Sequence, residues 1–327
     1  MAATEKRTAR LKALFQSPRT TLMPFGVLPI HAQMAEAAGF EAFEISGAMT
    51  SWWIGGCADV GLLTMTEMVA HAKRVADSVN IPVYCDADTG YGGPASVRRT
   101  VHEFIRAGIA GIHIEDQLNP KKAGAQPGIE LVSDEEAIGR IRAAVDARNE
   151  LDPDFVIVAR TDGYGATGGS VEEAIRRGRL YQEKTGADVI FYEGFHDWNQ
   201  VKRALAETPG PAYAIPHPTI SARPTMDELS KMGQSIEIVP FLLAGVQEEW
   251  NLLLKVKQAG HYGPMDEYLS SLARYRGTAN GIGWGDRFVK PNYKEVRQME
   301  EKYLPAELQR DYENNVNAED DAKNTYP

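Results

Sequence analysis

The sequence has few cysteines, no long apolar run and no excess of positive charge. Its 327 residues include only two cysteines, Cys57 and Cys85, and they form no CxxC pair. This argues against a disulfide framework and against a structural zinc site. No stretch approaches the roughly 18 apolar residues that a membrane helix needs, and the N-terminus has no apolar run of signal-peptide length. We therefore predict a cytoplasmic protein with no membrane partner.

The charge balance is acidic. The chain carries 35 Lys and Arg against 45 Asp and Glu, which gives a formal net charge of -10. Nucleic acid is not expected as a partner, because a phosphate backbone requires clustered Lys and Arg. A small anionic substrate is compatible with this balance, since a few local cations and a metal ion can reverse the field inside one pocket.

Short β-branched runs alternate with longer segments of helical periodicity along most of the chain. The runs that we interpret as strands are Thr21–Phe25, Glu41–Ser46, Pro82–Asp86, Gly111–Glu115, Phe155–Thr161, Asp188–Glu193, Ala212–Ile215 and Ile236–Pro240. The clearest helical segments are Met65–Val79, Ala95–Ala107, Asp134–Arg148, Val171–Lys184 and Leu242–Ala259. Eight strands that alternate with helices favour an α/β fold of the (β/α)8 TIM-barrel type over an open, doubly wound sheet.

The chain contains no linker that would mark a second domain. We therefore interpret residues 1–327 as a single barrel domain with additions at both ends. Residues 1–20 are expected to add an N-terminal helix. Residues 262–310, rich in Tyr, Arg and Glu, are expected to form a C-terminal helical extension, and residues 311–327 a polar tail.

Ionisable and hydroxyl side chains gather at the ends of five successive predicted strands. In a (β/α)8 barrel, catalytic groups come from the C-terminal ends of the strands and the loops that follow them. The segments concerned are Glu44–Gly47, Asp86–Gly92, His113–Gln117, Arg160–Asp162 and Tyr192–Gly194. Barrel packing alone gives no reason for this concentration, so the sequence predicts an active site at that rim.

The spacing of the acidic residues predicts a cation site. Asp86 and Asp88 are two positions apart, so on an extended strand both side chains point to the same side. Converging carboxylates cannot all stay ionised without a cation, and oxygen-rich sites of this kind suit Mg²⁺. Arg160 offers a planar fork for a substrate carboxylate.

Structural roles compete with these functional ones. The Asp86–Asp88 pair could be a solvated or capping pair, the Glu115–Asp116 pair a surface pair, and Arg160 one half of a salt bridge with a rim carboxylate. For His113 a bonded interior histidine is favoured over a catalytic one. The loop Gly163–Gly169 lacks the Lys-Ser/Thr ending of a P-loop, which favours flexibility over phosphate binding.

Four segments in one register, from about Arg10 to Gly260, carry a family resemblance: AGFEAFEISG, DADTGYGG, GIHIEDQ followed by PKK, and VIVARTD. Together they resemble the isocitrate lyase / phosphoenolpyruvate mutase superfamily, and its methylisocitrate lyase-like members in particular. The resemblance implies a TIM barrel whose C-terminal helix is exchanged between subunits of a homotetramer, a dimer of dimers.

The same resemblance implies Mg²⁺ as the cofactor, with Mn²⁺ as an alternative ion. Asp88 would bind the metal directly, while Asp86, Glu115 and Asp59 would act largely through water. Ser46, Gly47 and Arg160 would hold the carboxylate end of the substrate. The loop at about Leu118–Leu131 would be a lid, with Lys121 as a catalytic residue and Gly124 at the substrate. Glu115, Arg160 and Glu193 complete the predicted catalytic set.

The lid departs from the superfamily pattern. The lyases carry Lys-Lys/Arg-Cys-Gly-His there, and the cysteine serves as a general acid or base. This chain has Ala123 and Ala125 in place of the cysteine and the histidine. Either the cysteine was replaced by design or the natural reaction does without that acid, and the loss of both residues favours the second. Gln117 matches the lyases rather than the phosphonate enzymes.

The sequence therefore predicts a Mg²⁺-dependent carbon–carbon lyase of a small 2-hydroxy or 2-oxo carboxylic acid. Cleavage would be retro-aldol or decarboxylation, through a metal-stabilised enolate. Decarboxylation best tolerates the altered lid, because CO2 leaves without needing an acid. The alternatives are a hydrolase of oxaloacetate-like or phosphonopyruvate-like substrates and a catalytically silent relative that binds a ligand.

Overall fold

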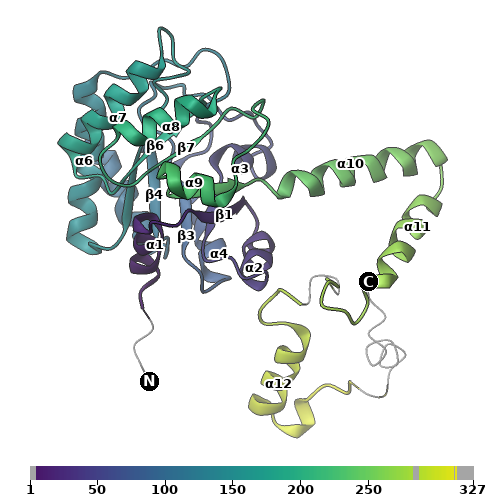
Figure 1. Cartoon of the computed structure of the whole chain (residues 1–327). Coiled ribbons are helices and arrows are strands. Elements are labelled where there is room, and N and C mark those ends of the chain that lie inside the picture. Colours follow the sequence, from purple (N-terminus) through teal and green to yellow (C-terminus); the bar gives the residue numbers. More distant parts are fainter. Residues whose placement is uncertain (1–4, 283–286, 313, 315–327) are drawn as a thin grey trace. The chain divides into compact units, whose positions relative to one another are not determined.

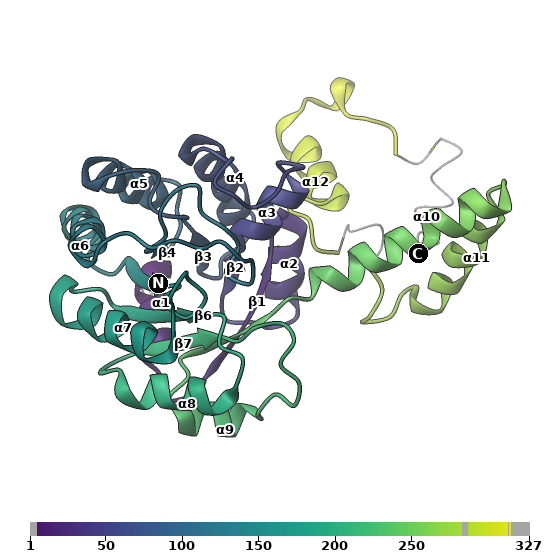
Figure 2. The same ribbon diagram turned by 90° about the horizontal axis from the view of Figure 1, so that it is seen from above.

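The computed structural model describes residues 5–282, 287–312 and 314. The chain divides into two compact units, residues 1–240 and residues 241–327. The first unit contains eight parallel strands in the order β7-β6-β5-β4-β3-β2-β1-β8, with the helices around them (Figures 1 and 2). This nearly closed barrel confirms the predicted (β/α)8 fold. The single-domain interpretation stays a prediction.

All eight predicted strands are present, within two residues of the expected bounds. They are β1 (Thr21–Gly26), β2 (Phe43–Ile45), β3 (Val83–Asp86), β4 (Gly111–Glu115), β5 (Val156–Thr161), β6 (Val189–Glu193), β7 (Ala212–Ile215) and β8 (Ile236–Val239). Most of their side chains are buried on both faces of the sheet, as a parallel sheet covered by helices requires.

The seam between β7 and β8 is closed partly by a side chain. The backbone N–H of Ser235 donates to the Ala212 carbonyl at 2.9 Å. The side-chain amide of Gln234 then bonds both backbone groups of Ala214, as a neighbouring strand would. It accepts from the Ala214 N–H at 3.0 Å and donates to the Ala214 carbonyl at 2.8 Å. These bonds satisfy backbone groups that would otherwise be buried without partners.

The helices of the first unit are α1 (Arg7–Gln16), α2 (Pro29–Ala37), α3 (Gly47–Trp53), α4 (Met65–Asp77), α5 (Pro94–Arg106), α6 (Asp134–Leu151), α7 (Val171–Thr185), α8 (Trp198–Glu207) and α9 (Met226–Met232). Several begin at the side-chain caps that their sequences indicate. Ser133 accepts from the Glu136 N–H and Ser170 from the Glu173 N–H, at 3.2 and 3.1 Å.

Helix α1 covers the N-terminal ends of the strands. Its Leu11 and Phe15 are fully buried, and the Phe15 ring lies 5.6 Å from the ring of Tyr84 inside the barrel. Lys12 pairs with Asp188, which directly precedes β6, at 3.1 Å. Because this end is plugged by apolar side chains, the opposite, C-terminal rim is the one available for chemistry.

The second unit is helical where it is described. It contains α10 (Leu242–Ala259), α11 (Gly263–Leu272), η1 (Ala273–Tyr275), α12 (Tyr293–Tyr303) and η3 (Ala306–Leu308). Helices α10 and α11 pack against each other (Figure 1). The predicted polar tail, residues 311–327, lies largely outside the described residues. None of the helices described in either unit is both long enough and apolar enough to cross a membrane.

Candidate active site

The C-terminal ends of β2 to β6 bring the predicted site residues to one rim of the barrel. Those on the strand ends are Ser46, Gly47, Asp86, Asp88, Glu115, Arg160 and Glu193; Asp59 follows α3, and Lys121 and Gly124 lie on the loop after β4. Most are buried, and the side chain of Glu115, only 2% exposed, lies at the centre. The position of the site follows the prediction, while the assigned roles stay predictions.

Asp86 and Asp88 come together through a turn and not through strand alternation. Strand β3 ends at Asp86, and Asp88 has a φ of 46°, in the left-handed region. The Asp88 N–H donates to Asp86 Oδ1 at 2.8 Å. The strand ends where it was predicted to end, but the alternation of an extended strand, on which the expected pairing of Asp86 and Asp88 relied, does not extend to Asp88. The turn is stabilised by a carboxylate that accepts from the backbone two residues on, as aspartates often do in turns.

The Lys121 ammonium lies within an acidic cluster. Its Nζ is 2.7 Å from Asp59 Oδ1, 2.7 Å from Asp88 Oδ1 and 4.0 Å from Glu115 Oε1. Burial acts against the charge of Lys121, but the surrounding carboxylates outweigh it and raise the pKa of Lys121 well above its ordinary value. Burial raises the pKa of Asp88 to about 6 against the attraction of Lys121.

Arg160 forms the second charged cluster. Its guanidinium donates to both carboxylate oxygens of Asp162, at 3.0 and 2.8 Å. It also lies 3.4 Å from Glu115 Oε2 and 3.6 Å from Glu193 Oε2. The salt bridge considered for Arg160 is thus present. Burial raises the pKa of Glu193 to about 7, because Arg160 offsets only part of the desolvation.

Glu115 connects the two clusters. One oxygen faces Lys121 and the other faces Arg160, yet neither oxygen accepts a hydrogen bond among the described residues. The proposed surface position of the Glu115–Asp116 pair is wrong, since both are buried. Asp116 accepts from the Asp162 N–H, the Thr161 hydroxyl and the Tyr181 hydroxyl at 2.8–3.0 Å, which fixes the end of β5.

His113 has the bonded interior position that its sequence context favoured. Its Nδ1 lies 2.9 Å from the Tyr84 hydroxyl, and its ring meets the ring of Phe191 edge-on. Its Nε2 is 3.2 Å from Asp86 Oδ1, close enough for an ion pair but outside hydrogen-bond geometry. Burial opposes ionisation of Asp86, but the charges of His113, Lys121 and Arg160 lower the pKa of Asp86 below its ordinary value.

Ser46 and Gly47 lie where β2 passes into α3. The Ser46 hydroxyl accepts from the Met49 N–H at 3.4 Å and so caps α3. A Cβ at position 47 would lie 2.4 Å from Asp86 Oδ2, so the aspartate carboxylate fits only against glycine. This contact joins the end of β2 to the acidic cluster.

The loop after β4 covers the rim. A Cβ at Gly124 would lie 2.1 Å from Cγ of Glu193 and 2.8 Å from Nη2 of Arg160, so the Gly124 backbone packs directly on both side chains. Ala123 and Ala125 flank this contact, and neither can carry a proton. The loop therefore covers Glu193 and Arg160, and it lacks the acid that the resemblance would supply.

The donors of the acidic cluster fit a hard divalent cation. Asp59, Asp88 and Glu115 offer only oxygen, which Mg²⁺ prefers, and the buried Lys121 ammonium already stands in for a cation among them. Neither oxygen of Glu115 accepts a hydrogen bond among the described residues, so both could bind a cation. In the described ranges, no three Asp, Glu, His or Cys side chains are preassembled as a ligand set, which agrees with Lys121 lying between the carboxylates.

Glu44 is a buried site residue to which the sequence reasoning assigned no role. It lies on β2, two positions before Ser46, and its Oε2 has no hydrogen-bond partner among the described residues. Burial, followed by the charges of Asp86 and Glu193, raises the pKa of Glu44 to about 8. A single carboxylate inside a strand gives no sequence signal, because its environment comes from other strands.

Glu44→Gln is expected to make the metal-free protein more stable at alkaline pH. Because the pKa of Glu44 is raised in the folded protein, protonated Glu44 contributes fully to the free energy of unfolding below about pH 4.5. This contribution is lost as the pH rises through about 8. The variant should exceed the wild type by about 2–4 kcal/mol near pH 9 and by little near pH 5. Urea denaturation in EDTA at both pH values measures this. Exposed Glu41→Gln is the control, and equal pH profiles for Glu44→Gln and the wild type would contradict the assignment.

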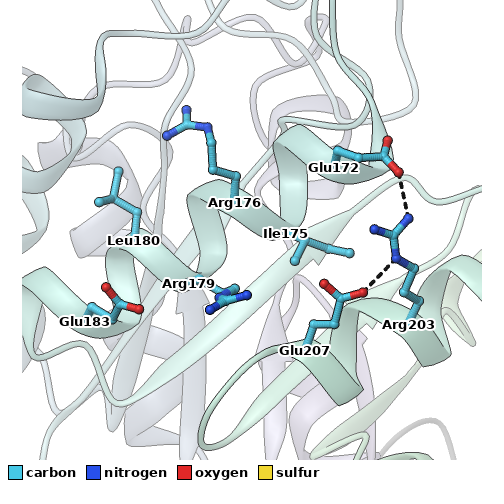
Figure 3. Close-up of a pocket in the computed structure, with 8 residues that line it drawn as sticks. All are labelled: Glu172, Ile175, Arg176, Arg179, Leu180, Glu183, Arg203 and Glu207. Carbon is cyan, nitrogen blue, oxygen red and sulfur yellow. Dashed lines mark hydrogen bonds and ion pairs between the residues drawn. The ribbon is translucent and has the colours of Figure 1, made fainter.

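A surface groove of about 370 Å³ lies away from the rim, between α7 and α8 (Figure 3). Its lining is charged, but Arg203 is already paired with Glu172 and Glu207 from the groove itself. The groove also lies on the outer helices α7 and α8 and not at the strand ends. We assign it no role in the chemistry.

Comparisons with known proteins agree with this architecture. Residues 11–246 match the phosphoenolpyruvate phosphomutase family. A 2,3-dimethylmalate lyase from Eubacterium barkeri is 40% identical over 235 residues, which cover 71% of this chain and 79% of that protein.

Two solved structures resemble the fold over most of their length. An oxaloacetate acetylhydrolase in complex with the inhibitor 3,3-difluorooxalacetate has a TM-score of 0.74 and 32% identity, and the match covers 80% of this chain and 90% of that one. A phosphonopyruvate hydrolase in complex with oxalate and Mg²⁺ has a TM-score of 0.76 and 27% identity, with coverage of 92% and 100%.

Proposed function

This chain belongs to the isocitrate lyase / phosphoenolpyruvate mutase superfamily of enzymes, and we propose that its rim cleaves a carbon–carbon bond in a small 2-hydroxy or 2-oxo carboxylic acid. One observation carries the proposal. Glu115 stands between a buried acidic cluster on one side and the Arg160 guanidinium on the other, and neither of its oxygens accepts a hydrogen bond among the described residues. This arrangement supports a cation site beside an anion site, both beneath the loop after β4.

The residues of the chain divide the work between binding and exclusion of water. Arg160 presents a planar cation to the substrate carboxylate, and Asp162 holds the guanidinium in place with two hydrogen bonds. Gly124 lets the lid backbone approach Arg160 and Glu193 closely, which excludes water from the reacting carbons. Ser46 and Gly47, where β2 passes into α3, would contact the carboxylate end of the substrate together with Arg160.

Asp59, Asp86, Asp88 and Glu115 would hold the divalent cation, with Mg²⁺ favoured and Mn²⁺ as an alternative. When bound, Mg²⁺ supplies the positive charge that stabilises the enolate developing as the bond breaks. Lys121 neutralises the same carboxylates from the lid side.

Proton transfer is assigned to Glu193 because the lid offers no acid. Its carboxylate lies beneath Gly124 and beside Arg160, and its pKa is raised to about 7, so both protonation states are accessible near neutral pH. Decarboxylation makes the smallest demand on such a group, since CO2 leaves without a proton. The altered lid therefore favours decarboxylation over retro-aldol cleavage.

A substrate panel tests the proposal. The protein is incubated with Mg²⁺ and a set of malate-like acids and 2-oxo acids, and the products are identified by mass spectrometry. We expect a 2-oxo acid product that disappears in EDTA. Glyoxylate or another carbonyl co-product would indicate retro-aldol cleavage, and CO2 would indicate decarboxylation. No turnover in the panel, or turnover that survives removal of the metal, would contradict the proposal.

Hydrolysis of an oxaloacetate-like or phosphonopyruvate-like acid is the second candidate. It is favoured by the two hydrolases among the structural neighbours, at TM-scores of 0.74 and 0.76. The same panel separates it, because hydrolysis of oxaloacetate releases oxalate and acetate instead of CO2. A restored lid, with Ala123→Cys and Ala125→His together, tests whether the lid alone selects between the reactions.

The homotetramer stays a prediction. The second unit gives support for association with another copy of the chain, because α10 exposes a stripe of apolar side chains at helical spacing along its length. Its members are Leu243, Val246, Trp250, Leu253 and Leu254.

A further inference from the structure

The side chain of Gln117 is bonded to the main chain of the lid at both of its polar atoms. Its Oε1 accepts from the Lys122 N–H at 2.8 Å, and its Nε2 donates to the Lys122 carbonyl at 2.9 Å. The side chain therefore forms the two hydrogen bonds that a neighbouring strand would form with the backbone of Lys122. Gln117 is fully buried, so water does not compete for these bonds.

The main chain of Gln117 is fixed at the base of the lid, where the loop leaves and rejoins the barrel. It forms a bridge with Leu131, and its carbonyl accepts from Nη1 of Arg140 on α6 at 3.3 Å. On either side, the Leu118 N–H donates to the Glu130 carbonyl and the Val132 N–H to the Asp116 carbonyl. The base of the loop is thus tied to the barrel. The side chain of Gln117 extends this anchorage to the main chain of Lys122. It does so alongside the Asn119 amide, which donates to the Thr89 hydroxyl at 3.1 Å, and the ion pairs of Lys121.

The bonded residue lies between the two lid residues that meet the site. Lys121, directly before Lys122, places its ammonium 2.7 Å from both Asp59 and Asp88. Gly124, two residues after Lys122, packs on Glu193 and Arg160. When the lid is held at Lys122, the Lys121 ammonium therefore lies in the acidic cluster and the Gly124 backbone covers Arg160 and Glu193.

We propose that Gln117 is a positioning residue that holds the lid closed through Lys122, and so sets where Lys121 and Gly124 meet the active site. The role requires an amide. A carboxylate at this position could accept from the Lys122 N–H but could not donate to its carbonyl, and an apolar side chain of the same length could do neither.

Trypsin provides a test that needs no substrate and no metal. The bond after Lys121 is cleavable only when the lid leaves the rim, because the Lys121 side chain is 1% exposed in the closed position. Gln117→Met keeps the length of the side chain and removes both hydrogen bonds. We expect cleavage at the bond after Lys121 to accelerate about tenfold or more, since the population of the open lid should rise by that factor.

Gln126→Met is the matched control, because Gln126 lies on the same loop and is exposed. Its cleavage rates should equal those of the wild type. Cleavage after exposed Arg276, followed by mass spectrometry in the same digest, serves as the internal reference. The melting temperature of Gln117→Met should stay close to that of the wild type, because the barrel anchorage of the main chain is retained.

Gln117→Glu distinguishes positioning from general packing. It preserves volume and the acceptor but loses the donor, so its cleavage rate should fall between the wild type and Gln117→Met. Equal rates in the wild type and Gln117→Met would overturn the inference, as would acceleration at Arg276 to the same extent. Either result concerns the lid alone, so it is distinct from a failure of the substrate panel.

Discussion

The Arg160→Met variant is expected to lose turnover and about 3–5 kcal/mol of stability. The substitution removes the cation that compensates Asp162, Glu115 and Glu193, all of which stay in the barrel rim. A buried carboxylate left without its partner carries a desolvation penalty that no water offsets. The loss should be visible as a lower midpoint in urea denaturation, and as the disappearance of product in the substrate panel.

Arg203→Met is the matched control for Arg160→Met. Arg203 also pairs with two carboxylates, Glu172 and Glu207, but it does so on the surface (Figure 3). Surface pairs contribute little to stability because solvent screens them, so this variant should be almost as stable as the wild type. Arg160→Lys keeps the charge but not the fork, and it should recover stability more than activity. Equal losses for the Arg160 and Arg203 variants would show that the rim cluster is not energetically special.

Asp88→Asn is expected to lower kcat/KM at least about 10³-fold while the barrel stays folded. Asparagine tolerates the left-handed φ of 46° at this position, so the turn after β3 can persist. The change removes one negative charge from the group that would hold Mg²⁺, and it leaves Lys121 with Asp59 as its close partner. Both effects act on the cation site and not on the fold.

Metal titration and circular dichroism measure the two consequences of Asp88→Asn. The variant should require a much higher Mg²⁺ concentration for half-maximal activity and should keep the wild-type far-ultraviolet spectrum. Asp77→Asn, at a surface ion pair on α4, is the control and should be unchanged. Wild-type kcat/KM in Asp88→Asn would remove Asp88 from the metal site.

The fold could be predicted from the sequence because each strand and helix is marked by a pattern of apolar residues within its own segment. Each strand is a short apolar run between helical segments, and the observed bounds of β4 and β7 are those expected. The position of the site followed from the barrel rule, which assigns chemistry to strand ends. Asp86 and Arg160 could therefore be located before any contact was known.

The contacts within the site could not be predicted in the same way. Asp88 follows β3 through a left-handed turn. Alternation along an extended strand correctly predicted that Asp86 and Asp88 lie together, but the turn and not the alternation brings them together. The ammonium of Lys121 among the carboxylates, the Gln117 bonds to Lys122 and the isolated Glu44 carboxyl all depend on segments distant in sequence or on loop conformation. A single sequence carries no periodic signal for such contacts.

Binding of oxalate in the presence and absence of Mg²⁺ tests the central claim most directly. Oxalate is a planar dianion with the shape of a pyruvate enolate, and the related phosphonopyruvate hydrolase has been solved with oxalate and Mg²⁺. Isothermal titration of the wild type should show binding that depends on Mg²⁺ and is lost in Asp88→Asn. Oxalate that binds equally well in EDTA, or that does not bind with Mg²⁺ present, would contradict a metal-assisted enolate site at this rim.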